Sequence, residues 1–257
     1  MKKHSAQKQI EKKGPMRILK YPAAVLLLVV LFAAQYLASR CGTYVSGMFD
    51  YSFIDADGLF AGVAVHHIVQ MLCALAAILI LRLIIKIKGF KLRPRVDSTG
   101  IKYTVVFCVL LILYYLGVYI AGSYMNTINT YDYELNTINI TGTLGFQLLL
   151  SGPSEEILFR SLPVTVLLSV LDPENKFDQT LAVLGAAVLF GIAHIDLVTF
   201  SIPWFQVGYA CLLGIAYGFA FVRSRSVIYP MIMHSMSNVI SVGGCYLYML
   251  FFMQKPV

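Results

Sequence analysis

The sequence predicts an all-α protein, a polytopic transmembrane helical bundle of about seven or eight helices. About 58% of the 257 residues are hydrophobic, only 13% are charged, and the apolar residues gather in long runs. A soluble domain usually carries about 25% charged residues. So few charges cannot cover this much apolar side chain in water, and the same composition excludes intrinsic disorder. An integral membrane protein with little soluble mass is therefore expected.

Each predicted helix corresponds to one apolar run, because about 20 residues span the hydrocarbon layer. The runs lie at residues 22–39, 61–85, 103–122, 143–171, 180–195, 205–222 and 226–241, and a short apolar tail at 243–253 is a candidate eighth element. The first run lacks a convincing cleavage site and is expected to stay as a membrane helix. The chain should form one membrane domain over residues 1–257.

The fourth run is longer than a membrane span and contains Gly152 followed by Pro153. A proline inside a helix kinks or ends it. We therefore expect a short lead-in helix and a second helix that begins at Ser154, with Ser154 as the N-cap and two carboxylates in the first turn.

The basic residues indicate the orientation in the membrane. Fourteen of the 20 lysines and arginines lie within residues 1–20 and 82–102, beside apolar runs. This pattern is typical of cytoplasmic segments next to anionic headgroups, so the N-terminus and its basic tail at 1–20 should be cytoplasmic. It speaks against nucleic-acid binding despite the net charge of +7. We favour a bacterial plasma membrane over the endoplasmic reticulum, and oligomeric state is left open.

Polar residues inside apolar runs are the candidates for function, since a charge at mid-membrane costs at least about 2.5–3.5 kcal/mol. They cluster in the second half of the chain: Glu155, Glu156, Arg160, His194, His234 and Asn238. The first three helices contribute only His66, His67 and Gln70, and we expect both of these histidines at the membrane interface, outside the site.

Glu155 and Glu156 should have different roles, although they are adjacent. Glu156 and Arg160 are four residues apart, so they share a helix face and can form an ion pair. Glu155 is rotated from Glu156 by about 100° and has no cation nearby in the sequence. A free carboxylate in a partly desolvated pocket has the character of a general base.

The remaining polar residues can complete a site around one water. His194 ends the fifth run, and His234 and Asn238 lie four residues apart in the seventh. Their side chains could orient a water, hold a metal, or donate hydrogen bonds to an oxyanion. Phe190 should pack beneath the site, and Asp196 should be a loop charge.

Three motifs in this region, Glu155-Glu156-x-x-x-Arg160, Phe190-x-x-x-His194 and His234-x-x-x-Asn238, resemble the signatures of the CPBP intramembrane proteases. That family includes the type II CAAX prenyl endopeptidases and the bacterial Abi, or bacteriocin-processing, proteins. The resemblance implies that Glu155 activates a water, that His194 helps bind it, and that His234 and Asn238 complete the site. It also implies a structural role for Glu156 with Arg160, and it places the catalytic core at residues 140–245.

The resemblance leaves the cofactor open. The family is described as metalloprotease, with a divalent metal such as zinc, yet a metal-free glutamate mechanism has also been proposed for it. A metal, if used, would be held by Glu155, His194 and His234. The sequence has no His-Glu-x-x-His motif that would support zinc independently.

The expected function is thus intramembrane hydrolysis of a peptide bond in a hydrophobic or lipidated membrane substrate. Two alternatives stay open: a transporter or proton relay, in which buried acids and histidines mark an ion path, and a non-catalytic immunity or scaffold protein on the same fold. Ser151 and Ser154 lack the context of a serine nucleophile. The five cysteines, with no C-x-x-C, indicate neither a disulfide framework nor a zinc site.

Overall fold

The computed structural model describes residues 14–252. Most of the predicted basic tail at 1–20 therefore lies outside the described residues. In the apolar tail at 243–253, only residue 253 lies outside them. Within that range the chain is helical, with connecting loops. Five helices are long and apolar enough to cross a membrane. They are α2 (Gly14–Ser46), α3 (Ala61–Leu83), α4 (Ser98–Met125), α9 (Trp204–Ser224) and α10 (Ile228–Phe252). The predicted all-α membrane bundle is confirmed.

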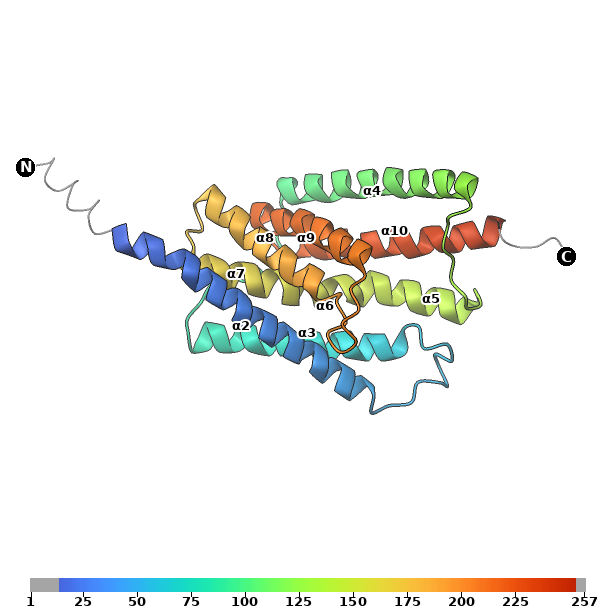
Figure 1. The fold of residues 1–257 in the computed structure, drawn as a ribbon, viewed down its shortest axis with the longest axis horizontal. Coiled ribbons are helices and arrows are strands. Elements are labelled where there is room, and N and C mark those ends of the chain that lie inside the picture. Colours follow the sequence, from blue (N-terminus) through green and yellow to red (C-terminus); the bar gives the residue numbers. More distant parts are fainter. Residues whose placement is uncertain (1–13, 253–257) are drawn as a thin grey trace, which may run out of the picture.

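One further helical rod forms the centre of the bundle. It is built from α5 (Thr137–Phe146), the π-helical turn η1 (Gln147–Ser151), α6 (Gly152–Glu156), the π-helical turn η2 (Ile157–Ser161) and α7 (Leu162–Val170). Segments of this rod contact α2, α3, α8 (Lys176–Ile192), α9 and α10. Figure 1 shows α5 to α7 running between α4 and α10 on one side and α2 and α3 on the other. Residues of the rod are therefore placed where several helices meet.

The predicted restart of the helix at Ser154 is wrong, because the rod is continuous through Pro153. Proline lacks the N–H group and its ring collides with the carbonyl four residues earlier. The rod contains a second proline, Pro163, in α7. The carbonyls four residues before Pro153 and Pro163 belong to residues 149 and 159, which lie in the π-helical turns η1 and η2. A π-helical turn widens the backbone locally, so the chain accommodates each proline without ending the helix. Ser154 is not an N-cap; its hydroxyl donates to the carbonyl of Ser151 at 3.0 Å.

The apolar tail from residue 243 is also not a separate eighth element. Helix α10 continues through Gly243 and Gly244 to Phe252. It packs along α4, and a Cβ atom on Gly244 would lie 2.8 Å from the Tyr119 ring. The glycine thus permits close packing of two helices here and does not end one.

A second glycine sets the distance between the rod and α10. A Cβ atom on Gly152 would lie 2.6 Å from the carbonyl oxygen of Met231 and 2.8 Å from the backbone nitrogen of Ser235. Backbone atoms cannot move aside as a flexible side chain can, so only glycine allows the two helices to cross this closely. The crossing brings Glu155 and Glu156 within reach of His234.

The start of α3 is fixed by Asp55, in the loop that precedes it. Its carboxylate accepts hydrogen bonds from the backbone N–H groups of Leu59, Phe60 and Ala61 at 2.6–2.8 Å. Burial opposes ionisation, but these N–H groups together hold the pKa of Asp55 below its usual range. The cap satisfies donors that have no partner inside the helix, and it anchors the helix that carries His66 and His67.

Candidate active site

The carboxylate of Glu155 lies between two imidazoles that come from different helices. Its Oε1 is 3.7 Å from Nε2 of His67 on α3, and its Oε2 is 3.6 Å from Nε2 of His234 on α10. The Glu155 side chain is 18% exposed. Hydrogen bonds to ionised groups are shorter than these separations, and no described residue forms a hydrogen bond to either oxygen. Both oxygens therefore stay available as proton acceptors.

His234 connects the two adjacent glutamates. Its Nδ1 lies 2.8 Å from Oε1 of Glu156, and its Nε2 faces Glu155. An ionised carboxylate only accepts hydrogen bonds, so Nδ1 carries a proton. In the neutral ring Nε2 is then an acceptor directed at the Glu155 side. The ring is stacked on Tyr217, with centroids 5.1 Å apart and planes 19° apart, which fixes its orientation.

The hydrogen bonds of Ser154 hold His67 in the same tautomer as His234. Its Nδ1 lies 2.8 Å from the Ser154 hydroxyl oxygen, and that hydroxyl donates its only proton to Ser151. Nδ1 of His67 must therefore be the donor, which leaves Nε2 as the acceptor in the neutral ring. The expectation that His67 lies at the interface, outside the site, is wrong. His67 is 9% exposed and lies on the buried face of α3.

The sequence shows one feature of this position, the polar pair of His67 and Gln70 three residues apart in an apolar run. His67, Gln70, Ala74 and Ile78 are the buried residues in the middle of α3, at spacings of three and four. Such spacing marks one helix face. His66 lies off this face, with Nδ1 at 3.4 Å from the Thr43 hydroxyl.

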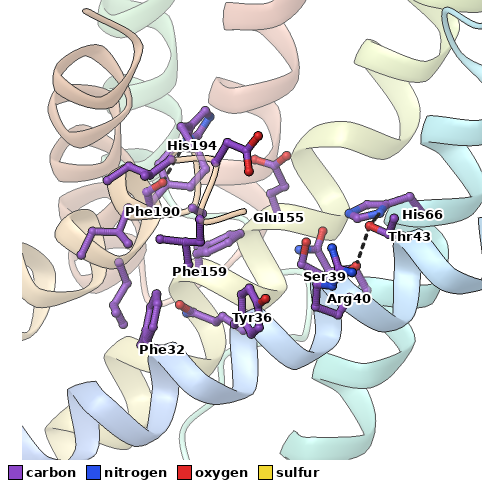
Figure 2. Close-up of a pocket in the computed structure, with 18 of the residues that line it drawn as sticks. Phe32, Tyr36, Ser39, Arg40, Thr43, His66, Glu155, Phe159, Phe190 and His194 are labelled. Atoms are coloured by element: carbon purple, nitrogen blue, oxygen red, sulfur yellow. Dashed lines mark hydrogen bonds between the residues drawn. The ribbon is translucent and has the colours of Figure 1, made fainter. Parts of the chain in front are cut away.

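His194 follows the end of α8 and lines the same cavity as Glu155. Its Nδ1 lies 2.9 Å from the carbonyl oxygen of Phe190, so Nδ1 is again the donor. Figure 2 shows Glu155, His194 and Phe190 around the cavity. Phe190 is buried and packs edge-on against both His194 and His234, as expected for a supporting residue.

Asn238 forms its hydrogen bonds with the rod and none with the Glu155 carboxylate. Its amide donates to Oε1 of Gln147 at 2.8 Å and to the Ser151 hydroxyl at 2.9 Å. Both partners belong to η1. His234 and Asn238 are four residues apart, so their side chains leave α10 in directions that differ by about 40°. The side chains of Gln147 and Ser151 accept both hydrogen bonds of the Asn238 amide. Asn238 thus ties α10 to the rod in this structure.

Asp196 is a loop residue. Its carboxylate accepts from the backbone N–H groups of Val198 and Thr199 at 2.8 and 3.2 Å and from the Thr199 hydroxyl. These bonds lower its pKa, since each favours the ionised form. It stabilises the turn after His194.

The predicted ion pair between Glu156 and Arg160 is present and fully buried. Nη1 of Arg160 lies 3.1 Å from Oε1 of Glu156, and both side chains have no exposed surface. The guanidinium also lies over the rings of Phe190 and Tyr217, at 4.2 and 5.1 Å from the centroids. Its nitrogens make no well-aligned hydrogen bond to a described residue. Electrostatic attraction and the two aromatic faces therefore hold the cation.

The cavity beside Glu155 has a volume of about 380 Å³. Its walls come from the middle of α2, the start of α3, the rod and the end of α8 with the following loop (Figure 2). Apolar side chains such as Phe32, Phe159 and Leu189 line one part, and Ser39, Arg40 and Thr43 line another. An amphiphilic chain with an apolar and a polar end would match this lining.

Residues 137–240 match the model of a family described as Rce1-like, type II CAAX prenyl endopeptidase. Comparison with curated proteins and with solved structures gave no match. The matched range contains the rod and both histidines of the second half, whereas His67 lies before it. The resemblance carried by the three motifs is confirmed.

Proposed function

We propose, on the premise that residues 137–240 match the model of the Rce1-like family of type II CAAX prenyl endopeptidases, that the protein is an intramembrane endopeptidase that uses Glu155 to activate water. That the chain is an integral membrane protein of a membrane-protease family follows from the family and the five apolar helices. The finer proposal concerns the residues and the order of proton transfers.

One observation carries this proposal. The Glu155 carboxylate lines a cavity, has no hydrogen bond from a described residue, and is flanked by two imidazoles at 3.6 and 3.7 Å. A general base must reach the proton that it accepts, directly or through one water. An acid that served only packing would instead be paired as Glu156 is, with a cation and a hydrogen-bond donor.

The proposed reaction needs one water and one carboxylate. Glu155 accepts a proton as the water oxygen attacks the scissile carbonyl carbon, and the carbonyl oxygen becomes an oxyanion. The protonated Glu155 then gives that proton to the departing amine nitrogen as the carbon–nitrogen bond breaks. His194 and His234 would stabilise the oxyanion when Nε2 is protonated, since each already has Nδ1 bound to the protein. The site ends in its starting protonation state.

We propose that the reaction needs no bound metal. Zinc would take imidazole nitrogens and carboxylate oxygens, but within residues 14–252 no three His, Cys, Asp or Glu side chains form a group that could hold an ion. We therefore assign no step to a metal and propose that proton transfer by Glu155 suffices.

The substrate class follows from the family and the cavity. We propose a membrane-associated peptide or protein whose cleaved segment carries apolar groups or a lipid, such as a prenylated CAAX sequence. The apolar part of the cavity, with Phe32 and Phe159, would contact such groups. A prenylated substrate requires a host that prenylates proteins, and an unmodified hydrophobic peptide is the other member of this class.

The test is cleavage by purified protein in liposomes, with a prenylated CAAX peptide and the same peptide without the prenyl group. We expect hydrolysis of at least one peptide, with one oxygen from ¹⁸O-labelled water in the new carboxyl group. Activity should persist after dialysis against a chelator. Loss of activity that zinc restores would contradict the metal-free route. Ion uptake by the liposomes without hydrolysis would favour a transporter. The absence of both hydrolysis and ion uptake would favour a non-catalytic protein.

His67 is expected to contribute through its Nε2 atom, and two substitutions separate its two nitrogens. In His67→Asn the amide can still donate to Ser154, but nothing occupies the position of Nε2. In His67→Gln a polar atom reaches towards that position. We expect His67→Asn to lower kcat by about 10²-fold, the lower range for loss of a proton-transfer partner, and His67→Gln to retain more activity. The pH dependence of kcat should change in both.

The control for this prediction is the neighbouring histidine. His66→Asn removes an imidazole from the same helix turn. His66 also lines the cavity, but no hydrogen bond or ion pair joins it to Glu155. The substitution can therefore change KM, and its effect on kcat should be at least tenfold smaller. Equal effects of the two Asn substitutions, or an unchanged pH profile, would show that His67 only supports packing.

A further inference from the structure

A strongly cationic cleft lies at the opposite end of α3 from the Asp55 cap. The loop between α3 and α4 folds against the ends of α7 and α9, on the left in Figure 1. Two adjoining cavities of about 410 and 390 Å³ share Lys88, Gly89, Lys91 and Arg225. Together they are lined by seven basic residues: Arg82, Lys88, Lys91, Arg93, Arg95, Arg223 and Arg225. Glu174 is the single acid in either lining, and no ion pair within residues 14–252 involves any of the seven.

The loop that carries these cations is fixed by the bundle. The carbonyls of Gly89, Phe90 and Lys91 accept hydrogen bonds from the Thr165 hydroxyl, the Ser161 hydroxyl and the backbone N–H of Val227, respectively. The Phe90 side chain is buried in the main core. Three consecutive carbonyls are thus anchored to the rod and to the segment before α10. The positions of Lys88 and Lys91 are therefore set by the fold.

Lys91 and Arg225 are held together at a cost to the folded state. Their φ angles are +52° and +53°, a left-handed conformation that costs free energy in residues with a side chain and that Lys86 in the same loop shares at +63°. The Lys91 ammonium lies over the Phe221 ring at 4.7 Å. Burial and then the charge of Arg225 lower the pKa of Lys91 to about 8. Like charges held close together are typical of ligand sites, where an anionic ligand compensates them.

The chemistry of the cleft identifies the ligand class. Arginine forks and lysine ammonium groups bind the oxygens of phosphate. Leu83, Ile84 and Ile85, which follow Arg82 where α3 leaves its apolar span, are all exposed. A ligand with phosphate beside an apolar chain would satisfy both surfaces. We propose that the cleft around Lys91 and Arg225 binds the phosphate headgroup of an anionic phospholipid as a defined site.

This proposal differs from a general attraction of basic loops to a charged membrane. A diffuse surface potential acts on all exposed lysines alike and decays within a Debye length. Lys86 and Lys102 provide the comparison, because they belong to the same basic region, are exposed and line neither cavity. A defined site should act on Lys91 and leave these two unchanged. The proposed lipid site does not depend on the proposed peptidase activity, because it uses other residues.

The first test uses the wild-type protein in lipid nanodiscs. Lysine acetylation is mapped by mass spectrometry in phosphatidylcholine and in mixtures with phosphatidylglycerol. We expect about fivefold slower acetylation of Lys91 with the anionic lipid, on the scale of one lysine–headgroup contact, and no change at Lys86 or Lys102. Equal protection of all three lysines, or no protection of Lys91, would overturn the proposal. Protection of Lys91 by inorganic phosphate in phosphatidylcholine nanodiscs would show that the cleft binds free phosphate and not a lipid headgroup. This result would also overturn the proposal.

The second test compares two double variants with the same loss of charge. Lys91→Gln with Arg225→Gln should weaken phosphatidylglycerol binding, measured by native mass spectrometry, by about 30-fold. Lys86→Gln with Lys102→Gln should leave it within about threefold. Equal weakening by both pairs would overturn the proposal. If the cleft variant does not fold, the wild-type acetylation pattern still decides.

Discussion

Glu155→Gln is expected to lower kcat for peptide hydrolysis by about 10²–10⁴-fold, the contribution of a positioned general base, while the protein still folds and inserts. Glutamine has nearly the shape of glutamate but cannot accept the proton of the attacking water. Because no described residue forms a hydrogen bond to the Glu155 oxygens, the substitution leaves no buried donor without its acceptor. The measurement is single-turnover hydrolysis in liposomes, with thermal unfolding in detergent on the same preparation.

The matched control is Glu134→Gln, which changes an exposed glutamate side chain in the loop before α5 by the same atoms. It should leave kcat unchanged. Glu155→Asp should be strongly impaired as well, since a shorter side chain withdraws the carboxylate from between His67 and His234. Wild-type hydrolysis by a well-folded Glu155→Gln variant would end the proposal that this acid activates water.

Arg160→Met is expected to lower the free energy of unfolding by about 3–5 kcal/mol, the cost of leaving a buried charge without its partner. Glu156 has no exposed surface, and after the substitution His234 would be its one remaining ion-pair or hydrogen-bond partner among residues 14–252. The physical cause is desolvation, since water cannot reach the charge to compensate for the lost cation. The measurement is the thermal unfolding midpoint in detergent, together with the abundance of the protein in membranes.

A second substitution distinguishes lost pairing from lost packing. In Glu156→Gln with Arg160→Met no charge is left unpaired, and the glutamine oxygen can still accept from Nδ1 of His234. The double variant should therefore be more stable than Arg160→Met alone, because neutral replacements of buried pairs are often tolerated. If the double variant is as unstable as Arg160→Met, the contacts of Arg160 with Phe190 and Tyr217 carry the stability.

The parts of the structure that follow from local rules were predictable. Apolar runs of about 20 residues specify membrane helices because backbone polar groups must be satisfied inside the bilayer. The Glu156–Arg160 pair follows from the four-residue spacing alone. Helix ends were less predictable: Pro153 indicated a break, but packing on five neighbouring helices keeps the rod continuous and two π-helical turns absorb the prolines.

The predicted site was partly assembled by the structure. Glu155 and His234 come together, and His194 lines the same cavity as Glu155. Asn238 bonds to η1 instead, and His67 takes a position beside Glu155 that no motif indicated. The difference lies in distance along the chain. His67 and Glu155 are 88 positions apart, and only the packing of α3 against the rod brings them together.

The amino-acid sequence by itself determined that this chain is a bundle of membrane helices and which acidic and basic groups lie inside it, because hydrophobicity and helical spacing are properties of neighbouring residues. The tertiary structure alone decided which nitrogen of each imidazole is free, which histidine of α3 lies beside Glu155, and where seven cations gather. These outcomes depend on how each helix is rotated about its axis, and that rotation is set by contacts between distant segments, such as the crossing at Gly152.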